Sequence, residues 1–143
     1  MKYYKRLKVY KASNVCFDPE TIEAESYGWW EFLKVIGGKV VFNDYRYSVT
    51  TTKHQSKVKG LLRGLDIKVD LYVQAPEGLQ SLQSAITYID YQIEKLQAEI
   101  DKPRSHRAKN DKRETEIYDL TVKKGEVLEL IDLQYVIERD WRA

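Results

Sequence analysis

Apolar residues in the second half of the chain recur at alternating steps of three and four positions. This spacing aligns side chains along one face of an α-helix. Because Pro76 suits the first turn of a helix, the pattern predicts a helix from about Pro76 to Asp101. Burial of each such side chain contributes roughly 1.5–3 kcal/mol, so this seam requires a covering partner. Its members are Leu79, Leu82, Ile86, Ile89, Ile93, Leu96 and Ile100.

A basic segment follows, and apolar residues then return at near-heptad spacing. Residues 102–113 contain a proline and carry six basic residues against one acidic residue, so we expect an exposed connector there. A second helix comes after it and ends near residues 135–141. Lys124 takes one seam position, and Gly125 weakens a helix by roughly 1 kcal/mol relative to alanine, so the continuity of this helix stays open. The other seam positions are Ile117, Leu120, Val127 and Ile131.

The first half of the chain is rich in β-branched and aromatic residues, which favour strands. The clearest local signal is the segment 32–42, in which Gly37 and Gly38 join two apolar runs. Because glycine adopts the positive φ angles that a two-residue β-turn requires, this segment predicts a hairpin. Two or three short strands are predicted before it, on the alternating residues Leu7 and Val9, Val15 and Phe17, and Ile22, Ala24 and Ser26.

A short helix and a further strand are predicted after the hairpin. Thr52 followed three residues later by Gln55 is a capping-box pattern, so we expect a helix from Thr52 to Gly64. This helix would present Val58, Leu61 and Leu62 to the core. Apolar and other residues then alternate over residues 67–73, which predicts a half-buried strand that returns to the same sheet.

Together these elements predict an α+β fold. We expect a small antiparallel sheet with one short packed helix over residues 1–75, followed by a long, coiled-coil-like helical hairpin over residues 76–143. The two helices can cover each other's seams, or two copies of the chain can pair through them. Because the second helix carries apolar residues on more than one face, we expect a hairpin that also forms a homodimer or a higher homo-oligomer.

Composition narrows the classes of function. The 24 basic and 22 acidic side chains leave a net charge of +2, too small to make nucleic acid or a membrane the default partner. The single cysteine, Cys16, excludes an intrachain disulfide framework, and its apolar neighbours favour a structural role. The chain has neither a signal-peptide pattern nor an apolar run of membrane-spanning length, so we expect a soluble protein of the cytoplasm.

No nucleophile, phosphate-loop or metal-ligand spacing stands out, so we expect a binding protein that is not an enzyme and has no cofactor or metal. Adjacent tryptophans in a strand point to opposite faces, which leaves one ring outside the core. An exposed ring beside tyrosine and arginine side chains can stack on a base or anchor a protein partner. Burial of both rings is an equally weighted alternative. The candidate residues are Trp29, Trp30, Tyr45, Arg46 and Tyr47.

The start of the predicted helix is a second candidate site, in this case for an anion. Lys53, His54 and Lys57 lie near its N-terminus, where backbone N–H groups and the helix dipole favour a phosphate, and Arg46 precedes it as a further cation. A solvated basic helix face with ordinary capping is the favoured alternative. An enzyme that acts on phosphates, with His54 as acid or base, is a third hypothesis.

Nucleic acid is the alternative partner. The basic helix 53–63 and the connector 102–113 both carry cations that can contact phosphates. The connector contains no aromatic residue that could stack on bases, which weakens this hypothesis. The connector residues concerned are Lys102, Arg104, Arg107, Lys109, Lys112 and Arg113.

Three segments, over residues 27–32, 38–48 and 51–58, resemble a recurring stretch of small uncharacterised accessory proteins encoded by tailed bacteriophages and prophages. The resemblance spans about residues 7–73, is most visible in Tyr27-Gly28-Trp29-Trp30-Glu31-Phe32, and assigns no functional residue. It implies a non-catalytic protein that acts by binding in the host cytoplasm. Counter-defence is the expected role, either by engaging a host protein or by sequestering a nucleotide-like signal.

Overall fold

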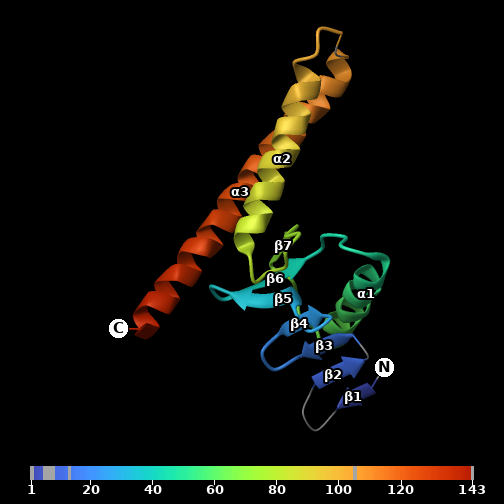
Figure 1. Ribbon diagram of the computed structural model, residues 1–143, viewed down its shortest axis with the longest axis vertical. Helices are drawn as coiled ribbons and strands as arrows, with labels where there is room; N and C mark the ends of the chain where they lie inside the picture. Colours follow the sequence, from blue (N-terminus) through green and yellow to red (C-terminus); the bar gives the residue numbers. More distant parts are fainter. Residues whose placement is uncertain (1, 5–8, 13, 105, 143) are drawn as a thin grey trace.

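The computed structural model describes residues 2–4, 9–12, 14–104 and 106–142, and the side chains of residues 14–104 and 106–134. The α+β class is confirmed: strands and one short helix are followed by two long helices (Figure 1). The strands are β1 (Lys2–Tyr4), β2 (Val9–Ala12), β3 (Val15–Asp18), β4 (Glu23–Ser26), β5 (Trp30–Ile36), β6 (Lys39–Asn43) and β7 (Leu71–Val73). The helices are α1 (Val49–Gly64), α2 (Leu82–Ile100) and α3 (Arg107–Arg142).

The described strands form one sheet whose spatial order follows the chain from β1 to β7. The pairs from β1 to β6 are antiparallel. The predicted hairpin is confirmed: Gly37 and Gly38 join β5 to β6 with φ angles of 58° and 77°. The last pair differs from the expected antiparallel sheet, because β7 runs parallel to β6 after the crossover through α1. The strand predicted over residues 67–73 is confirmed only for Leu71–Val73.

Helix α1 begins earlier than predicted. Ser48 is its N-cap: the Ser48 Oγ accepts from the Thr51 backbone N–H at 3.1 Å, and the Ser48 N–H donates to Thr51 Oγ1 at 2.8 Å. The predicted start at Thr52 is therefore wrong. Thr51, at the third helical position, fills the place in the capping box that the sequence pattern assigns to Gln55. The predicted end at Gly64 is confirmed.

The sheet carries a hydrophobic core on each face. Cross-strand partners share a face, so Leu33 and Phe42 point to one side, while Lys34 and Val41 point to the other. On the first side α1 contributes Val58 and Leu62 to a core that includes Val15, Phe17, Ala24, Trp30, Phe32, Leu33 and Phe42. On the other side the helical hairpin packs on the sheet, and its core includes Ile36, Val41, Leu71, Val73, Leu82, Ile86, Ile89, Val127 and Leu130.

Helix α2 begins at Leu82, so the predicted start near Pro76 is wrong. Pro76 and Leu79 lie in a linker that is bound to the sheet: the Pro76 carbonyl accepts from Trp30 Nε1 at 3.1 Å, and the Leu79 N–H donates to the Glu31 carbonyl at 2.8 Å. These tertiary hydrogen bonds hold the linker in a non-helical path. The predicted seam is confirmed in its first half, where Leu82, Ile86 and Ile89 are buried.

The exposed connector is shorter than predicted. The chain leaves α2 at Asp101 and re-enters a helix at Arg107, so residues 107–113 belong to the first turns of α3. After Pro103 this stretch holds no further proline or glycine, and alanine, lysine and arginine are good helix formers. Helix α3 is continuous through Gly125 to Arg142 and lies antiparallel to α2 (Figure 1).

Candidate functional site

A concave surface lies at the carboxyl ends of the parallel strands β6 and β7, between α1 and the α2–α3 hairpin. Ligands of sheets with parallel strands commonly bind outside the carboxyl ends of those strands. The surface consists of two adjoining cavities of about 630 and 570 Å³, which share Asp44, Gln74 and Tyr88. We call the two cavities together the tyrosine cleft. The hairpin-side cavity also includes Tyr72, Tyr91, Lys95, Glu116, Asp119 and Lys123, and the α1-side cavity Tyr45, Arg46, Thr52, Gln55, Ser56 and Lys59.

Buried amide side chains fix the loop that forms the floor of the cleft. Asn43 is fully buried; its Nδ2 donates to the Ala75 carbonyl at 2.8 Å, and its Oδ1 accepts from the Ala75 N–H at 3.0 Å. Gln55 Nε2 donates to the Asn43 carbonyl at 2.7 Å and to the Tyr45 carbonyl at 3.1 Å. The Asp44 N–H donates to the Val73 carbonyl at 2.9 Å. The backbone of residues 43–45 is therefore held by both α1 and the segment around β7.

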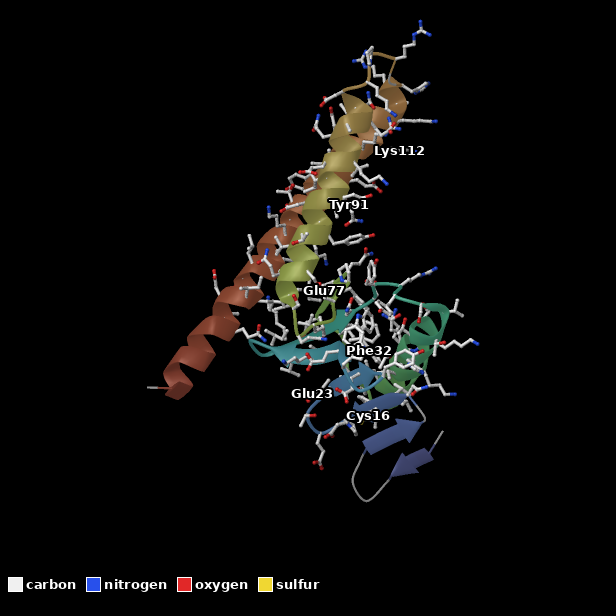
Figure 2. The ribbon with its side chains drawn as sticks, in the orientation of Figure 1. Cys16, Glu23, Phe32, Glu77, Tyr91 and Lys112 are labelled. Atoms are coloured by element: carbon white, nitrogen blue, oxygen red, sulfur yellow. The ribbon has the colours of Figure 1, made fainter. Side chains whose placement is uncertain are left out.

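Tyrosine rings line the cleft in a continuous series. Tyr45 meets Tyr88 edge to face at 5.2 Å between ring centroids, and Tyr88 stacks with Tyr91 at 6.4 Å. Tyr91 is 53% exposed and lies partway along α2, above the sheet (Figure 2). Such rings offer π-faces to a planar ligand at little cost in side-chain entropy.

Cations stand over or beside these rings. Lys59 Nζ lies 5.0 Å from the Phe42 ring centroid and 5.4 Å from that of Tyr72, and Lys95 Nζ lies 5.4 Å from that of Tyr91. Arg46 and Lys123 also line the cleft, on the α1 side and the α3 side respectively. Their ammonium and guanidinium groups are the donors that a phosphate or a carboxylate ligand requires.

Asp44 is the carboxylate at the junction of the two cavities. Burial raises its pKa above the ordinary aspartate value, while Lys59, Lys123 and Arg46 act in the opposite direction. Its own backbone N–H donates a hydrogen bond to the carboxylate and also lowers the pKa, whereas no described side chain forms an ion pair with it within 4 Å. A carboxylate that has a backbone partner but no side-chain partner among the described residues therefore lines the cleft.

The fold places the residues predicted for a binding surface in three different environments. Tyr45 and Arg46 line the tyrosine cleft. Trp30 is fully buried, so its predicted role as a ligand contact is wrong in this structure: the ring fills the core on the α1 side. Trp29 and Tyr47 are about half exposed and meet edge to face at 6.0 Å, outside the residues that line the cleft. A protein partner for this exposed pair stays a prediction.

The predicted anion-site residues on α1 do not line the cleft. Lys53 and Lys57 are exposed. His54 is half-buried; its Nδ1 lies 2.8 Å from the Oγ of buried Ser26, and its ring lies 5.9 Å from that of Tyr27. Burial lowers the pKa of His54, which favours the neutral ring. This contact gives His54 a structural function in joining α1 to β4.

The basic residues of the alternative nucleic-acid surface lie in two separate places. Lys102 pairs with Glu99 at 2.7 Å, and Arg113 approaches the same carboxylate at 3.7 Å. Arg104, Arg107, Lys109 and Lys112 are exposed near the tip of the hairpin, where Figure 2 labels Lys112. The tip lies far from α1, so the two predicted basic segments do not form one surface (Figure 1).

A small acidic depression of about 200 Å³ lies on β3–β5, lined by Cys16, Asp18, Glu23, Ala24, Glu25, Glu31 and Leu33. The Glu31 Oε2 atom is buried there without a hydrogen-bond partner. Nevertheless, the described residues contain no group of three or more histidine, cysteine or carboxylate side chains arranged to hold a metal ion.

Several cleft residues carry a sequence signal that the hydrophobic pattern alone does not reveal. Tyr88, Tyr91 and Lys95 follow one another at steps of three and four on α2, next to the apolar seam. This spacing places them on one helix face, beside the face that is buried. Asp44, Gln74 and Lys123 have no comparable signal, because only the crossover and the hairpin packing bring them together.

No protein-family model, curated protein or solved structure matches this chain. In the part of the chain that the structure describes, no helix has the length and apolar character needed to cross a membrane.

Proposed function

We propose that this protein binds a small nucleotide-like ligand in the tyrosine cleft, without catalysing a reaction. The observation that carries the proposal is the combination of stacked tyrosine rings and cations in one concave surface. A base needs a π-face, and a phosphate needs positively charged donors. Tyr88 supplies a ring at the boundary of both cavities, while Lys95 and Lys123 stand on the hairpin side.

The size of the cleft fits this class of ligand. Cavities of about 630 and 570 Å³ fall within the range of roughly 300–1,000 Å³ that is typical of small-molecule sites. The hydrogen bonds of Asn43 and Gln55 hold the floor in place, which reduces the entropy lost when a ligand binds.

The residues of the cleft favour binding over chemistry. Neither histidine nor cysteine lines the two cavities, and among the described side chains no base forms a hydrogen bond with the hydroxyl group of Thr52 or Ser56. Nucleophilic catalysis by a hydroxyl requires such a base within hydrogen-bond reach. Sequestration of a nucleotide-like signal, in the counter-defence context that the phage resemblance implies, is the role we assign to this binding.

The test is calorimetric titration of the full chain with the four ribonucleoside 5′-monophosphates. We expect binding by the native protein and a loss of roughly fivefold or more in affinity for Tyr88→Ala, because stacking on an aromatic ring contributes about 1–3 kcal/mol per base. Tyr27→Ala is the matched control, since Tyr27 is 43% exposed between β4 and β5 and does not line the cleft. Chromatography of the recovered nucleotide should show that it is unchanged.

Lys95→Gln provides a variant that does not alter the buried core, because Lys95 is exposed. We expect weaker binding of the monophosphates and a shallower dependence of affinity on salt, since one phosphate contact is lost. Absence of binding by the native protein, or equal affinities for the native protein and Tyr88→Ala, would contradict the proposed site. Turnover of a nucleotide would contradict the proposed absence of catalysis.

A further inference from the structure

The carboxylate of Asp44 is placed to form hydrogen bonds with a base bound in the tyrosine cleft. Asp44 lines both cavities, beside Tyr88, whose ring is the proposed stacking surface. A base that stacks on this ring has its edge within the cleft, where the polar groups of Asp44 and Gln74 are shared by the two cavities.

Asp44 is also preorganised. Its own N–H donates to the Val73 carbonyl. The carbonyls of the neighbouring residues Asn43 and Tyr45 both accept from Gln55 Nε2, and the Tyr45 N–H donates to Asn43 Oδ1. A carboxylate on such a fixed backbone loses little freedom on binding, so its geometry can discriminate between ligands. Its carboxylate accepts from its own backbone N–H and forms no ion pair within 4 Å with a described side chain, so lone pairs of the two oxygens are left to accept from a ligand.

An ionised carboxylate accepts hydrogen bonds and donates none. Guanine presents two adjacent donors on one edge, the N1–H and the 2-amino group, and these match the two oxygens of a carboxylate. Adenine presents an amino donor beside the N1 acceptor, whose lone pair faces a carboxylate oxygen. We infer that Asp44 makes the tyrosine cleft selective for guanine nucleotides. This inference rests on the proposed function, and it adds the identity of the base and the residue that selects it.

The surrounding cations are consistent with this assignment. Lys59, Lys123 and Arg46 are close enough to act on Asp44 electrostatically, yet none of them forms an ion pair with it within 4 Å. They can therefore engage the phosphate of the same nucleotide while Asp44 engages its base. The four cationic side chains line both cavities, two on each side of Asp44 at their junction.

The experiment compares guanosine, inosine and adenosine 5′-monophosphates by calorimetric titration of the full chain. We expect the guanine nucleotide to bind at least tenfold more tightly than the adenine nucleotide. The inosine nucleotide keeps the N1–H and lacks the 2-amino group, so its affinity should fall between the two. This comparison needs no variant, and so it does not depend on how a substitution affects folding.

Asp44→Asn then changes the donor and acceptor pattern without changing the size of the side chain. An amide donates to the adenine N1 and accepts from its amino group, so the preference for guanine should fall at least tenfold, and the adenine nucleotide should bind no more weakly than before. Asp44→Ala should lose affinity for the guanine nucleotide without gaining affinity for the adenine nucleotide. Asp132→Asn, an exposed substitution on α3, is the control for the change in net charge.

The outcomes separate this inference from the proposed function. Equal affinities for the three nucleotides, or an unchanged preference in Asp44→Asn, would overturn the role of Asp44 and leave nucleotide binding standing. Absence of binding by all three nucleotides would overturn both. Thermal unfolding of each variant, compared with the native protein, identifies a change in affinity that arises from loss of the fold.

Discussion

Buried polar side chains show where residue-scale prediction succeeds and fails. The pairing of Thr52 with Gln55 is a correct motif by spacing, yet Ser48 and Thr51 form the actual cap. Gln55 is instead buried and binds the carbonyls of the floor loop. A local motif does not reveal this, because the competing partner of Gln55 becomes available only when β6 packs against α1.

The two adjacent tryptophans give the opposite result. Alternation along a strand predicts that one ring is buried and the other lies outside. The structure has Trp30 fully buried at the first position of β5, whereas Trp29 is 49% exposed in the turn before that strand. The pattern alone does not identify which ring is inside. The register of β5 with β4 decides this, since Ser26, which pairs with Trp30, is itself buried.

The titration of His54 predicts that the free energy of unfolding depends on pH. Burial lowers its pKa in the folded state, so the unfolded state takes up a proton first as the pH falls through about 6.5. We therefore expect the free energy of unfolding to be highest above this pH and to decrease as the pH falls toward the lower pKa of the folded state. Urea unfolding between about pH 5.5 and 8 measures this dependence.

The matched variant is His54→Gln, whose amide can donate to or accept from the Ser26 hydroxyl but does not titrate. The difference in unfolding free energy between the native protein and this variant should change with pH below about 6.5 and stay constant above pH 7.5. A difference that is constant over the whole range would show that the fold does not perturb His54.

At the scale of elements, replacing a glycine is expected to have opposite effects on stability in a turn and in a helix. Gly38 and Gly125 both have open space where a Cβ atom would lie, but Gly38 has a φ of +77°, whereas Gly125 lies within α3. We expect Gly125→Ala to raise the free energy of unfolding by roughly 0.5–1 kcal/mol, because alanine loses less backbone entropy in a helix. Gly38→Ala should lower it, because an L-residue is strained at that φ.

Thermal and urea unfolding of the two variants measure this contrast. Since neither added methyl group meets a neighbouring atom within 4 Å, the opposite signs would arise from backbone conformation alone. Stabilisation by both substitutions, or destabilisation by both, would contradict the assigned conformations. This comparison also tests the continuity of α3 through Gly125, which the sequence pattern leaves open.

Tertiary contacts between elements explain the errors in the predicted element boundaries. The apolar seam correctly predicts α2 and its buried face, but the predicted helix begins too early because Leu79 continues the spacing outside the helix. Its N–H is bound to Glu31, so the linker follows the sheet instead of a helical path. Likewise, the six basic residues of segment 102–113 favour an exposed connector. Most of these basic residues instead lie in the solvated first turns of α3.

At the scale of the whole molecule, the position of the cleft follows from topology more than from any motif. The parallel β6–α1–β7 crossover and the packing of the hairpin on the sheet bring Asp44, Gln74 and Tyr88 together from three separate parts of the chain. The sequence pattern predicts most of the elements, although not β1, and it does not predict their relative placement. For this reason Tyr45 and Arg46 were found from the sequence, whereas the residues facing them from the hairpin were not.

Self-association is the remaining prediction at this scale. The seam of α2 is largely covered within one chain by α3 and the sheet, so the predicted dimer needs a different surface. Helix α3 offers one: Tyr118, Val122 and Leu128 are 69%, 48% and 42% exposed. Burying these side chains between two copies would contribute favourable free energy in proportion to the apolar area removed from water.

Light scattering coupled to size-exclusion chromatography measures the outcome. We expect a molar mass of twice the chain mass of 16.9 kDa for the native protein, and a monomer for Val122→Glu, because a charge in an apolar contact between helices is costly to bury. Val49→Glu is the control, since Val49 is 76% exposed on α1, away from α3. A monomeric native protein would contradict the dimer, and a dimer that survives Val122→Glu would exclude this face of α3 as its interface.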